Sequence, residues 1–445
     1  MIRAHSLVAA AWFALAPPIW AGVWVVDEFG GGDFLRIQPA VNAASDGDTI
    51  LVKTGSYPGF EVIDKALTIT AELAATVDVE GSARVFDLSA SKTVVLAGLA
   101  CVGVSGEGLN EYGFYAEDCA GSVRVERCTF LGADGTTGHR DGTDGARAVR
   151  CVDVAFSAID STGGRGLYAY WEGGPPPDPR GNGGMGLLVL DSTVSVFHAT
   201  LNGGDGVEPS SPSNYLDSGG HGGDGLRVMS PTIPASATTL IGSECTGGNG
   251  ADGGPSDGLL PSWGGDGGNG IRVESGLARV LGALASGGVA GWGWLHFGMT
   301  HFVATDGAHG LARAGDPGDF EDIAGSAREL TAGSPVREGE TLDLTFTGVP
   351  GDRVTLLVGL DARAQEYLPA WHATRLVQAP GSKAKSIRPI GVIPASGTLD
   401  VSLPVFDLGY GALARTLHLQ ALFRTSSNDI FASNAAMPVE LDAAY

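Results

Sequence analysis

A short unit that recurs along the middle of the chain constrains the fold more than any other feature. The unit is glycine, an apolar residue, any residue and then a small or apolar residue, with steps of 32, 21, 20, 39 and 45 residues between successive glycines. Internal similarity at such steps, with extra length placed in loops, is typical of a solenoid. The six copies begin at Gly113, Gly145, Gly166, Gly186, Gly225 and Gly270.

Each unit continues into further short strands. An alternating stretch such as 152–156 follows the glycine unit, and a third stretch then leads into a glycine pair. The pattern predicts three strands per turn, in which the two shortest steps each correspond to a bare turn and the longer steps to a turn that carries an inserted loop. The pairs are Gly163-Gly164, Gly203-Gly204, Gly247-Gly248 and Gly287-Gly288, and the Gly-, Pro- and Asp-rich stretches 172–178 and 208–214 are expected as surface loops.

The segment before these repeats carries a more specific signal. Ile37, Val41 and Ala44 are spaced as on one helix face, and residues 49–52 then have the pattern of a strand. The stretch from Ala44 to Tyr57 fits A-x-x-G-D-x-I-x-V-x-x-G-x-Y, and it resembles the N-terminal cap of the pectin-lyase-like right-handed β-helix superfamily of secreted bacterial type. The resemblance covers about residues 29–310 and implies a helical lid over the open apolar end of the solenoid.

From about residue 330 glycine becomes rarer and alternating strands recur, for example at 341–346, 353–358 and 416–423. This pattern of recurring alternating strands predicts a β-sandwich. We therefore expect an all-β chain with a right-handed parallel β-helix over 22–325, a linker within 314–335 and a β-sandwich over 330–445. The sandwich is expected to dock on the C-terminal end of the β-helix as a cap.

The N-terminal segment 1–21 has the layout of a secretory signal peptide. Arg3 precedes an apolar run over 7–15, and Ala21 precedes a plausible start of the mature chain at Gly22. No later run reaches the roughly 18 apolar residues of a membrane helix. We expect a secreted or cell-surface protein without a transmembrane segment.

The charge balance narrows the range of partners. Fifty acidic residues against 27 basic residues give a formal net charge of −23, which repels phosphate backbones and argues against nucleic acid. Cations, neutral glycans, proteins and components of a cell envelope remain open as partners. The five cysteines, Cys101, Cys119, Cys128, Cys151 and Cys245, would meet an oxidising compartment after export, and Cys119 and Cys128 are near enough in sequence to close a small loop.

Candidate ligand-binding residues come from one register position of the repeat. Arginine or tyrosine stands two places after the repeat glycine, where a strand residue points outward, and stacked turns would bring these side chains into a ladder. Such a ladder could hold a polysaccharide through guanidinium forks and aromatic rings, although ordinary solvent-exposed pairing with Asp or Glu is the simpler interpretation. The residues are Tyr115, Arg147, Tyr168, Arg227 and Arg272.

Two Gly-rich stretches resemble the calcium-binding nonapeptide G-G-x-G-x-D-x-U-x. They are 219–227 and 264–272, and they lie 45 residues apart without an adjacent repeat. Because calcium needs six to eight oxygens, one aspartate per stretch falls short unless carboxylates of stacked loops converge. Asp224, Asp252 and Asp266 are the candidate ligands, with Asp205 and Asp257 as further members of such a cluster. No cofactor other than Ca²⁺ is indicated.

Catalysis has weaker candidates. A lyase needs a base, and because no lysine occurs between Lys92 and Lys383, His221 or an arginine such as Arg227 would have to serve, with Asp224 nearby. Gly220-His221-Gly222 is similar to a Gly-His-Gly segment of polygalacturonases, but the paired aspartates of that family are missing. A hydrolase would draw its carboxyls from Asp141, Asp144 and Asp153 near His139, a spacing that a polar turn also explains.

The superfamily includes lyases, hydrolases, adhesins and inert surface proteins, so the fold alone does not assign a function. The first hypothesis is a non-catalytic secreted or surface protein that associates with polysaccharide or envelope partners. The alternative is a polysaccharide lyase or glycoside hydrolase acting on an acidic polysaccharide. A purely structural envelope component is a third possibility.

Overall fold

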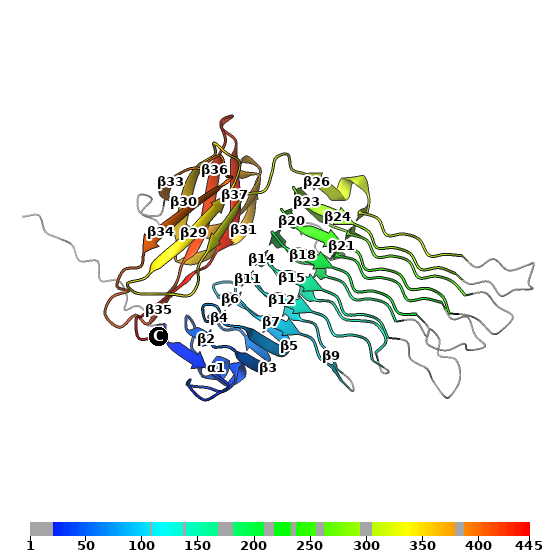
Figure 1. Ribbon diagram of the computed structural model, residues 1–445, viewed down its shortest axis with the longest axis horizontal. Coiled ribbons are helices and arrows are strands. Elements are labelled where there is room, and N and C mark those ends of the chain that lie inside the picture. The colour runs from blue at the N-terminus through cyan, green and yellow to red at the C-terminus, as the bar shows by residue number, and fades with distance from the viewer. Residues whose placement is uncertain are drawn as a thin grey trace, which may run out of the picture.

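The computed structural model describes residues 21–106, 109–136, 139–167, 181–208, 218–232, 237–254, 262–293, 305–378 and 387–445. A parallel β-helix forms the main body, an antiparallel β-sandwich lies beside it, and long extended segments project from the opposite side (Figure 1). The predicted signal peptide falls on residues 1–21, of which 1–20 lie outside the described residues. No helix in the described ranges is long and apolar enough to cross a membrane.

One face of the β-helix is a parallel sheet to which each turn contributes one strand. Its register is regular, as in the pairing of Val123 with Val154 and of Val154 with Val194. In order across the sheet the strands are β1 (Val23–Val26), β2 (Thr49–Val52), β4 (Leu67–Ala71), β6 (Thr93–Ala97), β11 (Ser122–Glu126), β14 (Asp153–Ser157), β17 (Val194–Phe197), β20 (Ala237–Ile241), β23 (Leu277–Leu281) and β26 (Phe320–Asp322). We call this face sheet A.

The remaining strands form a second parallel sheet with two arms, which we call sheet B. The arms meet at the long strand β5 (Val77–Phe86), which pairs with β3 (Gly55–Ile63), with β7 through 78–80 and with β10 through 83–86. One arm holds β7 (Ala100–Val102), β12 (Thr129–Leu131), β15 (Asp160–Thr162), β18 (Thr200–Asn202), β21 (Glu244–Thr246) and β24 (Leu284–Ser286). The other holds β10 (Phe114–Glu117), β13 (Ala146–Val149), β16 (Leu187–Leu190), β19 (Leu226–Met229), β22 (Ile271–Val273) and β25 (Arg313–Ala314).

The predicted N-terminal lid is confirmed as helix α1 (Ile37–Ala43), which is followed by β2. Ile37, Ala40 and Val41 point into the core, and the inward residues of successive turns continue that core along the β-helix. Gln38 ties the lid to the first long strand, because its side chain accepts the backbone N–H of Glu61 at 2.7 Å and donates to the Glu61 carbonyl at 3.2 Å. The lid thereby covers the apolar end that a solenoid would otherwise expose.

The C-terminal region is the predicted β-sandwich. One layer pairs β27 (Glu329–Ala332), β29 (Thr341–Thr347) and β34 (Thr398–Pro404), and the other pairs β33 (Ile387–Val392), β30 (Arg353–Gly359), β36 (His418–Arg424) and β37 (Ile430–Ala436). The short strands β28 (Val336–Arg337), β38 (Val439–Leu441) and β35 (Ala414–Thr416) form a third sheet, and β31 (Asp361–Leu368) pairs with β32 (Ala373–Gln378). Most of these pairings are antiparallel, which confirms the all-β class with a parallel β-helix followed by a sandwich.

The expectation that the sandwich caps the C-terminal end of the β-helix is wrong. It packs along the flank, over the outer face of sheet A (Figure 1). Outward residues of that sheet, including Phe197, Ile241 and Leu281, share a core with β36 and β37 of the sandwich. Polar contacts add to it, because Asn434 donates to the Ser157 hydroxyl at 2.9 Å. Phe197, Ile241 and Leu281 are register partners on consecutive turns, so they form an apolar row on the outer face of sheet A that must be covered along the flank, not at one end.

The Gly-rich segments that the structure describes form a packed array, whereas the stretches predicted as surface loops, 172–178 and all but the first residue of 208–214, lie outside the described residues. Segments 163–167, 181–186, 203–208, 218–225, 247–254, 263–270, 287–293 and 305–312 run side by side outside any helix or strand (Figure 1). Several have a three-residue repeat of two glycines and a third residue, as in 219–225 and 264–270. We call these segments, with 132–136 and 139–145, the Gly-Gly-x array.

Backbone hydrogen bonds link each segment of the array to several others. Gly204 donates to the Gly184 carbonyl at 2.8 Å, whereas the preceding Gly203 donates to the Thr246 carbonyl, also at 2.8 Å. Successive N–H groups that point to different neighbours, together with a three-residue period, are features of packed polyproline II-type helices. A Cβ atom on Gly204 would lie 2.1 Å from the Gly164 carbonyl oxygen, so this close approach requires glycine.

The array explains an error in the predicted turns. The unit at Gly166 begins in the array and not in sheet B, because Gly166 donates to the Asp205 carbonyl at 3.1 Å. Strand β13 pairs directly with β16, with Arg147 opposite Leu188, so the two shortest steps, which meet at Gly166, together make up one turn and not two. The glycine pairs predicted after the third strand are confirmed, since β15, β18, β21 and β24 each end immediately before one.

Candidate functional site

The predicted ladder is present on the outer face of sheet B. Tyr115 pairs with Arg147, and Arg227 pairs with Arg272, each through the register of neighbouring parallel strands. Leu188 holds the place that the sequence assigned to Tyr168, which lies outside the described residues. In order from β3 to β25 the ladder contains Glu61, Arg84, Tyr115, Arg147, Leu188, Arg227, Arg272 and Ala314.

The ladder arginines are tied to acidic or aromatic neighbours. Arg147 donates through Nη1 to the Tyr112 hydroxyl at 2.7 Å, its guanidinium lies over the Tyr112 ring, and the Asp144 carboxylate is 3.9 Å from Nη1. Arg227 and Arg272 share Glu274, which Arg272 reaches through Nε at 3.1 Å. This pairing is the simpler interpretation of the ladder. It also fixes the direction of each guanidinium before any ligand arrives.

Tyr115 stands beside a second aromatic ring. The Tyr112 and Tyr115 ring centroids are 5.3 Å apart, and the Tyr115 hydroxyl donates to the Glu117 carboxylate at 2.7 Å. Burial of the phenol, reinforced by that carboxylate, raises the pKa of Tyr115 well above its ordinary value. The phenol of Tyr115 therefore stays protonated. The two half-buried rings of Tyr112 and Tyr115 form a fixed aromatic surface beside the ladder.

The arginine end of the ladder borders an open groove of about 510 Å³ on one side of the Gly-Gly-x array. It brings together five of the residues predicted from the sequence for the ladder, a metal site or a lyase, which are His221, Asp224, Arg227, Asp266 and Arg272. Backbone of the glycine pairs forms much of its floor. The other polar side chains along it are Asp141, Asp144, Asn182 and Asn269.

Residues spaced as the x positions of the three-residue period form a row of acceptors along the groove. Asp141 accepts the N–H of Asn182 at 2.8 Å, and the Asn182 side chain accepts the N–H of His221 at 2.9 Å. His221 in turn accepts the N–H of Asp266 through Nδ1 at 2.9 Å, and Asp266 accepts the N–H of Ala308 at 2.7 Å. Each side chain thereby satisfies a backbone donor of another segment.

A second row runs parallel to the first. Asp144 accepts the N–H of Met185 at 3.0 Å, Asp224 accepts the N–H of Asn269 at 2.8 Å, and the Asn269 side chain accepts the N–H of Leu311 at 3.0 Å. Asp224 also accepts from the Asn269 side-chain amide at 2.8 Å. The sequence predictions did not include Asn182 or Asn269. The three-residue period of Gly-Gly-x was the signal that could have identified them.

The candidate metal ligands do not converge. Asp224 and Asp266 line the groove in different rows, whereas the Asp252 carboxylate accepts the N–H of Trp292 at 2.6 Å. Asp205 accepts the N–H of Asn249 at 2.8 Å, and Asp257 lies outside the described residues. Across the described part of the chain, no three His, Cys, Asp or Glu side chains are placed to hold a metal ion together. Calcium binding at these residues stays a prediction.

The carboxyls proposed for a hydrolase are also separated. Asp153 lies on β14 in sheet A, where its carboxylate pairs with the buried Arg124 at 2.7 Å. Asp141 and Asp144 lie in the groove instead. Asp144 is buried, and desolvation raises the pKa of its carboxyl above the ordinary value, although the Met185 N–H and Arg147 oppose that rise. The expected cluster of three aspartates near His139 is therefore wrong.

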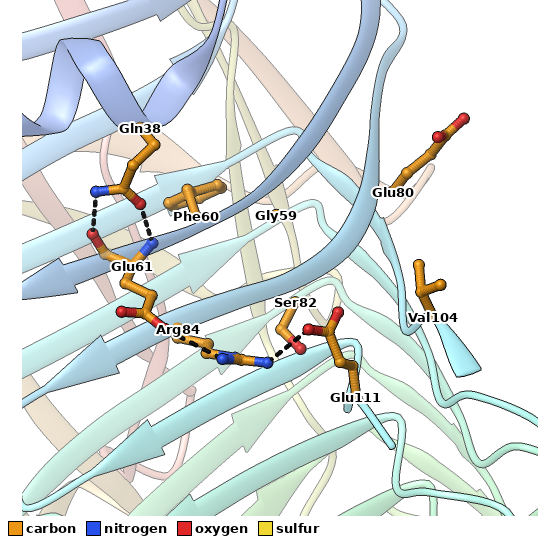
Figure 2. Close-up of a pocket in the computed structure, with 9 residues that line it drawn as sticks. All are labelled: Gln38, Gly59, Phe60, Glu61, Glu80, Ser82, Arg84, Val104 and Glu111. Carbon is orange, nitrogen blue, oxygen red and sulfur yellow. Dashed lines mark hydrogen bonds and ion pairs between the residues drawn. The ribbon is translucent and has the colours of Figure 1, made fainter. Parts of the chain in front are cut away.

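A second cavity lies further along the ladder, next to the helical lid, with a volume of about 440 Å³. Figure 2 shows Arg84 in it between two carboxylates, with Glu61 at 3.1 Å and Glu111 at 2.8 Å. Gln38 and Ser82 also line the cavity. The sequence predictions missed Arg84 because it lies upstream of the first repeat glycine, although its register position is that of Tyr115.

The groove has more acidic than basic side chains. Its lining contains four aspartates, Asp141, Asp144, Asp224 and Asp266, against two arginines, Arg227 and Arg272. Both of these arginines already face Glu274. Together with a formal net charge of −23 for the chain, this balance disfavours an anionic ligand in the groove. The groove offers fixed donors and acceptors to an uncharged polar ligand.

No protein-family model matches the chain, and no curated protein matches it. Among solved structures, the chain is similar to the receptor-binding protein of bacteriophage Det7, a podoviral tailspike in a myovirus. That similarity has 12% sequence identity, covers 86% of this chain and 72% of the other, and has a TM-score of 0.17. The assignment of the fold rests on the strand register described above.

Proposed function

We propose that this chain is a secreted or surface β-helix protein that binds a neutral polysaccharide, without cleaving it, along the groove beside Arg227 and Arg272. The observation that carries the proposal is the groove itself. It crosses consecutive turns in register, so polar side chains from successive turns recur along its length. A polymer of similar sugar units is the kind of ligand that such a repeated surface suits.

The chemistry of the lining supports a sugar ligand. Sugar hydroxyls both donate and accept hydrogen bonds, and the groove presents guanidinium N–H donors near aspartate and asparagine acceptors. The Tyr112 and Tyr115 rings, next to Arg147 on the ladder, add an apolar surface of the kind on which sugar rings lie. The excess of carboxylates favours a neutral glycan over the acidic polysaccharide that unpaired arginines would have suggested.

A binding test with product analysis addresses this proposal directly. The full chain is incubated with matched neutral and acidic polysaccharides, with and without calcium, and retention on each polymer is measured beside the polymer's size distribution. The expected result is retention on at least one neutral polysaccharide, with the polymer unshortened. Absence of retention on every neutral polymer would overturn the proposal.

Cleavage of a polysaccharide is the second candidate function, and Asp144 is the observation that favours it. A carboxyl whose pKa is raised by burial, beside an open groove, is suited to donate a proton to a leaving group. Shortened polymer in the same assay, lost in Asp144→Asn, would establish a lyase or hydrolase. Unshortened polymer with retained binding would support the non-catalytic role.

A further inference from the structure

All five cysteines are buried inside the β-helix, and none of them forms a disulfide in the structure. Three are buried thiols for which burial is the largest influence on the pKa, although Cys128 also adds to the rise at Cys101. Burial raises the pKa of Cys101, and it raises the pKa of Cys128 and of Cys245 to about 12. The remaining two, Cys119 and Cys151, differ because they interact with each other.

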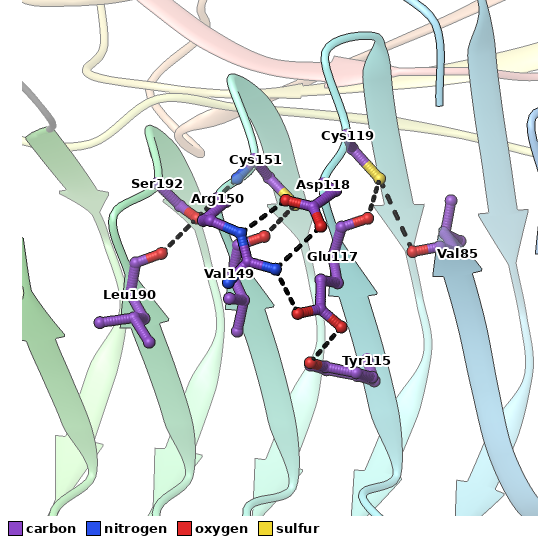
Figure 3. A network of polar contacts seen from close by, with 10 residues as sticks. All are labelled: Val85, Tyr115, Glu117, Asp118, Cys119, Val149, Arg150, Cys151, Leu190 and Ser192. Carbon is purple, nitrogen blue, oxygen red and sulfur yellow. Dashed lines mark hydrogen bonds and ion pairs between the residues drawn. The ribbon is translucent and has the colours of Figure 1, made fainter. Parts of the chain in front are cut away.

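Cys119 and Cys151 occupy the same corner of two consecutive turns. Each follows its strand of sheet B by two residues, since β10 ends at Glu117 and β13 ends at Val149, and these two residues are register partners. The backbone continues the match, because Val152 donates to the Cys119 carbonyl at 2.8 Å. Figure 3 shows both side chains on adjacent strands at this corner.

The stacking distance suits a covalent bond. Neighbouring parallel strands lie about 4.8 Å apart. The Cα atoms of a disulfide are usually about 4.4 to 6.8 Å apart, so two cysteines at one register position of adjacent turns lie within this Cα range. Equivalent corners on consecutive turns therefore place the two residues within the geometric range of a disulfide.

Other pairings do not share one register position, since Cys101 lies opposite Phe130 of the next turn, two residues after Cys128. Cys119 and Cys128, which the sequence suggested could close a small loop, lie on either side of strand β11, so that expectation is wrong. Cys101 and Cys245 share a row of sheet B, but β12, β15 and β18 lie between their strands.

The two thiols also differ in acidity in a way that matches direct contact. A hydrogen bond from the Cys151 thiol lowers the pKa of Cys119, and the same contact raises the pKa of Cys151. In such a pair Cys119 is the sulfur that ionises first, which makes it the nucleophile of a thiol–disulfide exchange.

We propose that Cys119 and Cys151, which are buried in the folded chain, form a disulfide across consecutive turns of the β-helix when this corner is open to a low-molecular-weight disulfide as oxidant, as it is during folding. In the first step the Cys119 thiolate attacks one sulfur of the oxidant, forms a mixed disulfide and releases one thiolate. In the second step the Cys151 sulfur loses its proton and attacks Cys119, which releases the second thiolate. The protein loses two electrons and two protons, and the oxidant is reduced to two thiols.

The cross-link would reinforce two turns that already hold part of the ladder. On the outer surface, Arg150 Nε contacts the Asp118 carboxylate at 2.6 Å, and Nη2 contacts Glu117 at 2.5 Å (Figure 3). Glu117 also accepts from Tyr115. The disulfide would join the same two turns from the inside, directly beneath the strands that carry Tyr115 and Arg147.

Thiol counting and peptide mapping of the full chain test this inference. The folded chain is incubated with oxidised glutathione, and a second sample is unfolded and refolded in the same buffer. Both are then denatured, alkylated without reductant, digested and mapped by mass spectrometry. Cys119→Ser removes the proposed nucleophile, and Cys245→Ser is the matched control because it removes a buried thiol from another turn.

The expected result is three alkylated cysteines in the wild-type chain and a linked peptide that joins residues 119 and 151, with a mass lower by two hydrogens than the sum of its parts. Cys245→Ser should keep that linked peptide, and Cys119→Ser should lose it. Five alkylated cysteines in both wild-type samples, or a link that joins any other pair, would overturn the proposal. The readout is independent of glycan binding, so its failure would leave the proposed function untouched.

Discussion

The Asp224 carboxylate accepts the backbone N–H of Asn269, 45 residues further along the chain, at 2.8 Å. The same oxygen accepts the Asn269 side-chain amide at 2.8 Å, and Asn269 repeats the arrangement with Leu311 on the next segment. These contacts make Asp224 and Asn269, the third residues of two Gly-Gly-x triplets, into cross-ties between segments. Asp224 thus has a structural role within a stretch whose sequence resembles a calcium-binding loop.

Removing this cross-tie should destabilise the array. Asp224→Ala leaves the Asn269 N–H, which is partly buried, without its acceptor, and the expected loss in free energy of unfolding is about 1 to 3 kcal/mol. Urea unfolding followed by circular dichroism measures the loss. Asp78→Ala, at an exposed position of β5, is the matched control and should change stability by less than about 0.5 kcal/mol. Equal stabilities of the two variants would contradict the structural role of Asp224.

The close packing of the array predicts strict requirements for glycine. In Gly204→Ala the new Cβ would lie 2.1 Å from the Gly164 carbonyl oxygen, so the segments must separate. We expect a loss of about 3 kcal/mol or more, because the clash involves backbone on both sides. Gly318→Ala is the control, since a Cβ there meets no atom within 4 Å. Thermal unfolding of both variants checks the prediction, which fails if Gly204→Ala melts with the wild-type chain.

The boundary between the β-helix and the sandwich contains a pH-sensitive carboxyl. Burial raises the pKa of Glu126 from 4.5 to about 7, and the nearby Arg127 and the Met437 backbone N–H offset part of that rise. Glu126 lines a small cavity of about 30 Å³ together with Glu329, Leu330 and Asn434. Arg127 Nη1 lies 3.9 Å from its carboxylate, and both of its oxygens lack a hydrogen-bond partner of standard geometry.

The direction of the pH effect follows from that shift. Between pH 4.5 and 7 the unfolded chain has released the Glu126 proton while the folded chain still holds it. The stability that the neutral carboxyl contributes is therefore complete below pH 4.5 and is lost as the pH rises to about 7, by about 3 kcal/mol in total. Glu126→Gln should be more stable than the wild-type chain at pH 8 and equal to it at pH 4.

Comparing the two chains isolates this effect from other groups. Burial lowers the pKa of His418 to about 3, and this group acts in the opposite direction by reducing stability as the pH falls below 6.5. Subtracting the unfolding free energies of wild-type and Glu126→Gln chains at each pH removes the His418 contribution. Glu80→Gln, at an exposed position, serves as the control. If the difference in free energy of unfolding between the wild-type and Glu126→Gln chains stayed constant from pH 4 to pH 8, Glu126 would have an ordinary pKa.

The sequence predicted correctly those elements whose residue pattern depends only on local backbone geometry. The helical spacing of Ile37 and Val41 predicted the lid, and the glycine pairs predicted the ends of the third strands, because both patterns follow from local geometry. The unit at Gly166 was misassigned because glycine followed by an apolar residue also occurs inside the Gly-Gly-x array. The three-residue period of the array arises from contacts between segments that are far apart in the sequence. A search for strand patterns does not detect such a tertiary feature.

The sequence also contains a signal for the position of the sandwich, which the expectation of a C-terminal cap did not take into account. Val196-Phe197, Leu240-Ile241 and Val280-Leu281 are consecutive apolar pairs at the ends of sheet A strands, so both faces of these strands must be covered. One face meets the interior of the β-helix, and the other meets the sandwich. The ladder residues at the groove could be predicted from strand register. Glu274, Asn182 and Asn269 could not be predicted in this way, because their roles depend on contacts across turns.

The most direct test of the account is the affinity of groove variants for the neutral polysaccharide that the wild-type chain retains. Arg227→Gln with Arg272→Gln removes both guanidinium groups from the groove, and Arg424→Gln removes an arginine from the exposed end of a sandwich strand. Thermal unfolding first establishes that both proteins are folded. The account predicts at least about a tenfold rise in the dissociation constant, or about 1.4 kcal/mol, for the groove variant and no change for Arg424→Gln. Equal affinities of the wild-type chain and the groove variant would contradict it.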